Sequence, residues 1–128
     1  MKHIAHTLIS ASLLLMPLSA LAHAHLEKSD PADKSTLTTS PDHFTLVFSE
    51  SAHLTSLTLQ KDGSPAPRKI TGLPQAANDH FTVAAPKLGA GAYTLRFRSV
   101  ATDDNHVSSG AIRFTVAPGA RAATTQSR

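Results

Sequence analysis

The residues of this chain that are best suited to chemistry are histidines and the aspartates near them. Eight histidines occur, and six of them, beginning with His23, follow residue 22. Asp104 and His106 are separated by one residue, and on an extended chain residues i and i+2 point to the same side. A carboxylate and an imidazole on one side of a strand are suited to binding one metal ion. Alone, however, an Asp-x-His sequence is also typical of a polar loop before a strand.

The beginning of the chain has the three-part pattern of a secretory signal peptide. Lys2 gives a positive start, residues 8–18 form a mostly apolar run, and Ala20 and Ala22 are small residues at the positions that a signal peptidase reads. The apolar run is too short for a membrane span. We therefore expect residues 1–22 to be a cleaved signal peptide and the mature protein to be periplasmic.

Cleavage after Ala22 would make His23 the first residue of the mature chain. Its α-amino group, with a pKa of about 8, and its ring could then bind one metal together. Cu(II) prefers such nitrogen-rich tetragonal sites. His25 would be third from the free amine, and this arrangement can instead wrap Cu(II) or Ni(II) with two deprotonated backbone amides. Cleavage after Ala24 is a second possibility and would leave His25 first.

The mature chain contains no sulfur ligand. The sequence has no cysteine, and its two methionines, Met1 and Met16, lie in the predicted signal peptide. Disulfides and thiolate metal sites are therefore excluded, and soft ligands for Cu(I) are missing, whereas imidazole and carboxylate suit Cu(II).

Charge gives little support for a nucleic-acid partner. The full chain has 12 Lys and Arg against 9 Asp and Glu, but Lys2, Arg121 and Arg128 lie near its ends, and residues 23–118 are balanced. The sequence pI of about 9.6 is therefore mostly a property of the ends.

Strand patterns dominate the mature chain. Apolar and polar residues alternate in five segments, residues 44–48, 57–59, 81–83, 93–97 and 112–116. Strict alternation predicts half-buried strands, and many short strands favour one antiparallel β-sandwich of the Greek-key type. We expect the domain to cover residues 23–118 and residues 119–128 to form a flexible tail.

Turn residues separate these segments. Lys61-Asp62-Gly63-Ser64 and the glycines of residues 89–91 are interpreted as hairpin connections. His43, His53 and His80 fall at predicted strand ends or turns and are interpreted as solvated side chains. A weak second metal site from His53 or His80 is the alternative.

The sequence resembles the CopC family of periplasmic copper-resistance proteins over nearly the whole mature domain. The matching residues are His23-Ala24-His25-Leu26 with Ser29 and Pro31, Leu46-Val47-Phe48-Ser49-Glu50, Gly91-Ala92-Tyr93-Thr94-Leu95, and Ser99-Val100 with Asp104-Asn105-His106, Gly110 and Phe114-Thr115-Val116. The order and spacing of these pieces are more specific than any one of them.

The resemblance implies an all-β, seven-stranded cupredoxin-like or immunoglobulin-like sandwich that binds one Cu(II). His23 would give its amine and ring, Asp104 a carboxylate oxygen and His106 a ring nitrogen. Glu50 matches an acidic position near that site and would be an outer ligand, an acceptor that orients a histidine ring, or a solvated charge. His25 is a further possible ligand.

Two departures from the family pattern have consequences. Residues 63–82 contain no methionine, so the separate Cu(I) site of some relatives is not expected. Asn105 occupies a position that is often glycine or another small residue, which asparagine can tolerate because it accepts unusual dihedral angles.

The function expected from these residues and the resemblance is Cu(II) binding without catalysis. The bound copper would be sequestered, for tolerance, or delivered to an inner-membrane CopD-type partner by a monomeric protein. One alternative is an enzyme similar to the terminal-histidine copper monooxygenases, although the chain has no tryptophan and one tyrosine for a sugar-binding surface. Another alternative is a metal-free immunoglobulin-like interaction domain.

Overall fold

The computed structural model describes residues 24–119, which form seven strands and no helix. The strands are β1 (Leu26–Asp30), β2 (Ser35–Leu37), β3 (His43–Lys61), β4 (Arg68–Lys69), β5 (Asn78–Ala84), β6 (Gly91–Ala101) and β7 (Val107–Val116). The predicted signal peptide, His23 and residues 120–128 of the predicted tail lie outside these residues. In this described range no helix is long and apolar enough to cross a membrane.

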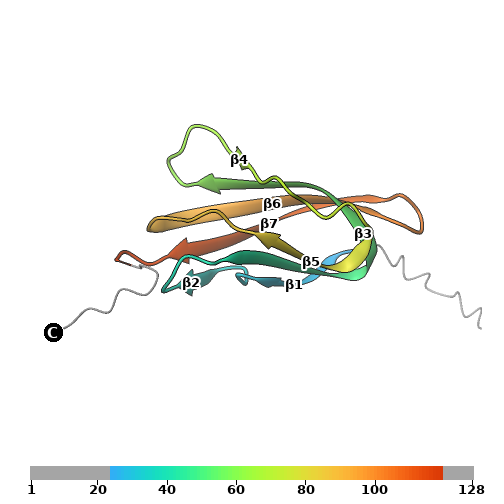
Figure 1. The fold of residues 1–128 in the computed structure, drawn as a ribbon, viewed down its shortest axis with the longest axis horizontal. Coiled ribbons are helices and arrows are strands. Elements are labelled where there is room, and N and C mark those ends of the chain that lie inside the picture. The colour runs from blue at the N-terminus through green and yellow to red at the C-terminus, as the bar shows by residue number, and fades with distance from the viewer. Residues whose placement is uncertain (1–23, 120–128) are drawn as a thin grey trace, which may run out of the picture.

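The longest strand, β3, belongs to both layers of the sandwich. Its first half pairs with β1 and β5, and its second half pairs with β4 and β6. Figure 1 shows β3 running along one layer, bending at one end of the molecule and returning along the other. β6 then pairs antiparallel with β7. The prediction of an all-β sandwich of seven strands is confirmed.

One pair of strands departs from the antiparallel prediction. β2 pairs with β7 in parallel, with Ser35 opposite Phe114 and Leu37 opposite Val116. The bend in β3 explains this direction. β1 is antiparallel to the first half of β3, whereas β7, which is joined to β3 through β6, has the same direction as the returning half (Figure 1).

The core contains the apolar residues of the alternating segments. Each of the following side chains is at most 6% exposed: Phe44, Leu46, Phe48, Leu57, Leu59, Phe81, Val83, Tyr93, Leu95, Phe97, Ile112, Phe114 and Val116. Burying a large apolar side chain stabilises a fold by about 1.5–3 kcal/mol relative to leaving it exposed. Alternation therefore predicted the core residues correctly, because every second side chain of a strand points to the same face of the sheet.

The two predicted hairpin connections differ in outcome. Lys61 to Ser64 forms a turn after β3, with Gly63 at a φ of 84°, and the chain returns as β4 antiparallel to β3. The prediction at residues 89–91 is wrong, because β5 pairs with the first half of β3 while β6 pairs with its second half and with β7. That connection crosses from one layer to the other.

Tyr93 provides a prediction about alkaline pH. Burial raises the pKa of its hydroxyl above the ordinary value of 10.0, and the hydrogen bond to the Gly89 carbonyl oxygen partly opposes this rise. Tyrosine therefore ionises more readily in the unfolded chain than in the folded one. Its contribution to stability is complete below a pH of about 10 and is lost as the pH rises through the folded pKa.

Because the chain has one tyrosine and no tryptophan, the phenolate absorbance measures this ionisation directly. We expect a titration midpoint above that of free tyrosine, returning to the ordinary value in urea. Tyr93→Phe should remove the 2.8 Å hydrogen bond to the Gly89 carbonyl and cost about 0.5–1.5 kcal/mol at neutral pH. A folded midpoint at or below the unfolded one would contradict the assignment.

Candidate metal centre

The described chain begins with a buried alanine at the end of the sandwich where β3 bends. Ala24 is 1% exposed and packs in a small cluster with Ala52 of β3 and Ala101 of β6, which are 0% and 2% exposed. Ala52 and Ala101 are also direct partners in the β3–β6 pair. The cluster therefore fixes the first described residue beside the last residue of β6.

Hydrogen bonds to Ser49 hold the next residue, His25. The His25 amide donates to Ser49 Oγ at 3.0 Å, the His25 carbonyl accepts from the Ser49 amide at 2.8 Å, and Nδ1 of the His25 ring lies 3.1 Å from Ser49 Oγ. Both the backbone and the ring of His25 are thus fixed against β3.

Asp104 and His106 lie in the turn between β6 and β7. The Asp104 carboxylate accepts a hydrogen bond from the His106 amide at 2.9 Å. The turn is closed by bonds from the Asn105 amide to the Ala101 carbonyl, 3.1 Å, and from the Ala101 amide to the His106 carbonyl, 2.9 Å. All the residues of this turn, 102–106, are exposed.

Asp104 and His106 share one turn, but the prediction that an extended chain places them on the same side is wrong. They do not lie on an extended strand, because residues 102–104 form a turn and Asn105 has a left-handed φ of 57°. The Asp104 carboxylate instead reaches the backbone of His106, as short polar side chains often do in turns. The tolerance expected of Asn105 for an unusual dihedral angle is confirmed.

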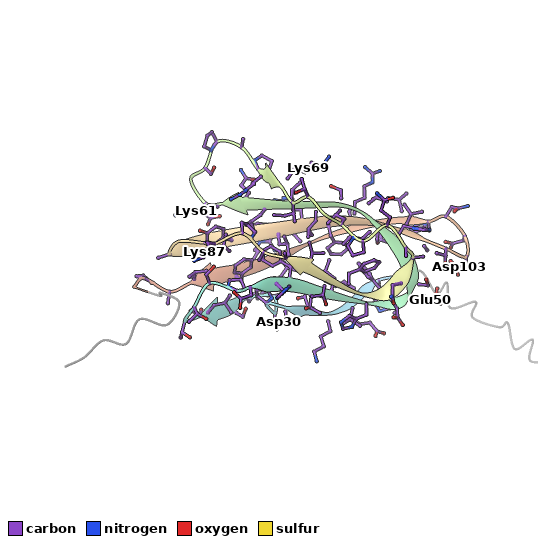
Figure 2. The ribbon with its side chains drawn as sticks, viewed as in Figure 1. Asp30, Glu50, Lys61, Lys69, Lys87 and Asp103 are labelled. Atoms are coloured by element: carbon purple, nitrogen blue, oxygen red, sulfur yellow. The ribbon has the colours of Figure 1, made fainter. Side chains whose placement is uncertain are left out.

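The bend of β3 lies between the start of the described chain and the turn that contains Asp104 and His106. On one side of the bend Ser49 binds His25, and on the other side the Ser51 carbonyl accepts bonds from the amide and the hydroxyl of Thr102, at 3.2 and 3.1 Å. Glu50, which is half-buried, lies between these two contacts in the chain. Figure 2 shows Glu50 and Asp103 at the same end of the sandwich.

The structure thus brings four of the five predicted site residues, His25, Glu50, Asp104 and His106, to one end of the molecule. The fifth, His23, lies outside the described residues and immediately precedes buried Ala24. Within residues 24–119 alone, no group of three or more His, Asp or Glu side chains is arranged to hold a metal ion.

The other histidines are exposed, in agreement with their interpretation as solvated side chains. His43 begins β3, His53 follows the bend with Nδ1 3.3 Å from the Gln75 carbonyl oxygen, and His80 lies opposite Val47 on β5.

Sequence reasoning missed the residues that position this site. Ser49 and the cluster of Ala24, Ala52 and Ala101 were given no role, yet they fix the start of the chain against β3 and β6. No local pattern indicated the cluster, because its three alanines lie in separate segments: before β1, within β3 and at the end of β6.

Comparison with known proteins relates the chain to one family. A family model described as the CopC domain matches residues 26–117. The crystal structure of CopC from Methylosinus trichosporium OB3b aligns with a TM-score of 0.64 and 25% identity, over 76% of this chain and 96% of that one. The crystal structure of selenomethionine PcoC, a copper resistance protein from Escherichia coli, aligns with a TM-score of 0.52 and 26% identity, over 72% and 98%. A search of curated sequences found no match.

Proposed function

The chain belongs to the CopC family, and from this premise we propose that the mature protein binds one Cu(II) ion in the periplasm without catalysing a reaction. The copper would be sequestered, for tolerance, or delivered to an inner-membrane CopD-type partner. The observation that carries the proposal is the packing of Ala24 against Ala101, which joins the start of the domain to the turn that holds Asp104 and His106.

The donor set fits Cu(II). If cleavage leaves His23 first, its amine and ring are one residue from a fixed position, Ala24, at the end that carries Asp104 and His106. Nitrogen and carboxylate oxygen donors suit Cu(II) and leave Cu(I) without a soft ligand. Since the carboxylate of Asp104 and the ring of His106 are exposed in the described turn, a metal can reach them without opening the core.

The contacts of His25 support this site over the competing mode in which copper binds deprotonated backbone amides. In that mode the His25 amide nitrogen would have to lose its proton, and this proton is the one donated to Ser49 Oγ at 3.0 Å. The His25 ring would also have to leave Ser49. The competing mode would therefore break the contacts that fix the start of β1.

The aromatic residues favour binding over polysaccharide oxidation. All five phenylalanines and the one tyrosine are buried, so they offer no exposed aromatic platform for a sugar chain. The fold uses these rings for packing, as in the stacked pair of Tyr93 and Phe114, whose centroids are 5.6 Å apart.

Two substitutions at Asp104 test its role as a copper ligand. Asp104→Asn keeps an oxygen that can accept the bond from the His106 amide but loses the negative charge, whereas Asp104→Ala loses both. We expect both variants to weaken Cu(II) binding by about tenfold or more, because even residues outside a metal's immediate ligands typically contribute 10–100-fold. Affinity is measured by Cu(II) titration against a competing chelator.

His43→Ala is the matched control, because His43 is also exposed but lies at the start of β3, away from the bend. It should bind copper like the unmodified protein. If Asp104→Asn binds normally and only Asp104→Ala is impaired, Asp104 shapes the turn and is not a ligand.

Ala24→Leu tests whether packing at the start of the chain positions the site. The three alanines of the cluster leave no room for a larger side chain, and overpacking a well-filled site typically costs about 1–3 kcal/mol. We expect the domain to stay folded and the first residues to be displaced, with copper affinity falling by about tenfold or more. Glu27→Ala, an exposed change on β1, is the control, and unchanged affinity in Ala24→Leu would show that this packing is not needed.

A further inference from the structure

A cavity with a basic rim lies at the opposite end of the sandwich from the metal centre. Its volume is about 200 Å³, and it lies between the turn after β3 and the connection from β5 to β6. Lys61, Arg68 and Lys87 line it, each from a different segment of the chain. Figure 2 shows Lys61 and Lys87 at this end and Glu50 and Asp103 at the other.

The charged side chains that line this cavity are all positive. No Asp or Glu among the described residues lines it. A neighbouring hollow that shares Arg68 and contains Lys69 also has no carboxylate, so the positive region extends beyond the cavity. Two other hollows with basic residues do contain carboxylates: one combines Lys28 with Glu27 and Asp33, and another combines Lys34 and Arg113 with Asp62. Because residues 23–118 are balanced in charge overall, three cations without a carboxylate form a local excess of positive charge.

The apolar side of the cavity is formed by Leu59, Leu88 and Tyr93. The Tyr93 hydroxyl donates to the Gly89 carbonyl at 2.8 Å, and the Leu88 amide donates to Ser40 Oγ at 2.8 Å. These bonds fix the connection that carries Lys87 and Leu88. The wall is therefore formed before any ligand binds.

Lys61 is also held in place. Its side chain lies across Gly91, where a Cβ atom would come within 2.7 Å of Lys61 Cε. Its ammonium nitrogen lies 5.9 Å from the centre of the Tyr93 ring. A residue other than glycine at position 91 would have to displace the end of the Lys61 side chain, and the φ of 149° at this position also favours glycine.

We propose that this cavity binds a small organic oxyanion, with its carboxylate or phosphate group among Lys61, Arg68 and Lys87 and its carbon atoms against Leu59, Leu88 and Tyr93. Arginine pairs with both groups through two parallel hydrogen bonds, and lysine supplies a point charge. This site is separate from the metal centre and does not depend on copper binding.

The test is an NMR titration of the metal-free mature protein labelled with ¹⁵N. Inorganic phosphate and citrate are the probes for the two oxyanion classes, and sodium chloride at matched ionic strength is the reference, because general screening affects all exposed charges. We expect saturable shifts of the amides of Lys61, Arg68 and residues 87–91 with at least one of the two oxyanions and not with chloride. Which of them saturates at the lower concentration tells phosphate from carboxylate.

Single variants then locate the site. Lys87→Gln and Arg68→Gln should each weaken this binding by about tenfold, since one of three charge-assisted contacts is lost. Both side chains are exposed, so the fold should be retained. Lys28→Gln, in a hollow that has its own carboxylates, should change nothing. Shifts that chloride reproduces, that do not saturate, or that Lys28→Gln weakens equally would overturn the proposal.

Discussion

One extra residue before His23 of the mature protein should weaken Cu(II) binding by about 100-fold or more. The extension converts the terminal amine into an amide nitrogen, which does not bind metal readily at neutral pH, and so removes the chelate formed with the His23 ring. The fold should be unaffected, because Ala24 and the hydrogen bonds of His25 would remain in place. The measurement is a Cu(II) titration of both proteins, with the EPR spectrum of each copper complex.

A residue added after Arg128 provides the control, because it changes the length of the chain at the other end. That protein should bind one equivalent of copper with the unmodified affinity and spectrum. Equal binding by the protein extended before His23 would rule out the terminal amine as a ligand. The other histidines, or a function without metal, would then have to be considered.

Replacing Phe114 with alanine should lower the free energy of unfolding more than Tyr93→Phe or Ala24→Leu does. Its ring is 2% exposed, stacks on Tyr93 and lies 6.1 Å from the ring of Phe44, centre to centre. Phenylalanine-to-alanine changes in a core typically cost about 3–5 kcal/mol, and domains of this size have about 5–15 kcal/mol in total. We expect urea unfolding to show a loss of this size.

Ser109→Ala on the same strand is the control and should shift stability by less than about 0.5 kcal/mol, because Ser109 is exposed. At temperatures where Phe114→Ala is folded, its copper affinity should be normal, because Phe114 lies near the end of β7 that is far from the turn of Asp104 and His106. A loss below about 1 kcal/mol would mean that this part of the core repacks without a cavity.

The sequence predicted the core well because alternation is a local property of strands. Phe44, Leu46 and Phe48 required no knowledge of their partners to be placed on the buried side. The pattern also changes phase between Leu54 and Leu57, where the pairing of β3 with β6 has a register shift. The sequence analysis did not include this change, because it treated residues 57–59 as a segment of their own.

The path of the chain between layers could not be predicted in the same way. β3 bends near Glu50 without a glycine or proline, so residues 44–48 and 57–59 were read as separate segments. The glycines of residues 89–91 indicate a turn but not which strands it joins. The parallel direction of β2 follows from the bend in β3, which is a tertiary feature.

The candidate site, like the fold, could be predicted from the sequence only in part. Residue types and spacing identified Asp104 and His106, because two metal-binding groups in one short segment need no fold to be noticed. Their actual relation depends on the left-handed Asn105 and on the bond from the His106 amide to the Asp104 carboxylate. The contributions of Ser49 and of the buried alanines could not be found, because they arise only when the start of the chain meets β3 and β6.

The position of copper tests the account most directly. Cu(II) is paramagnetic and broadens the NMR signals of nearby amides, so a small addition to the ¹⁵N-labelled mature protein maps the bound ion. We predict selective loss of signals from residues 24–26, 49–52 and 101–107, while Lys61 and Lys87 at the opposite end keep theirs. Broadening centred on His43 or His80, with the turn of Asp104 and His106 unaffected, would contradict the proposed site.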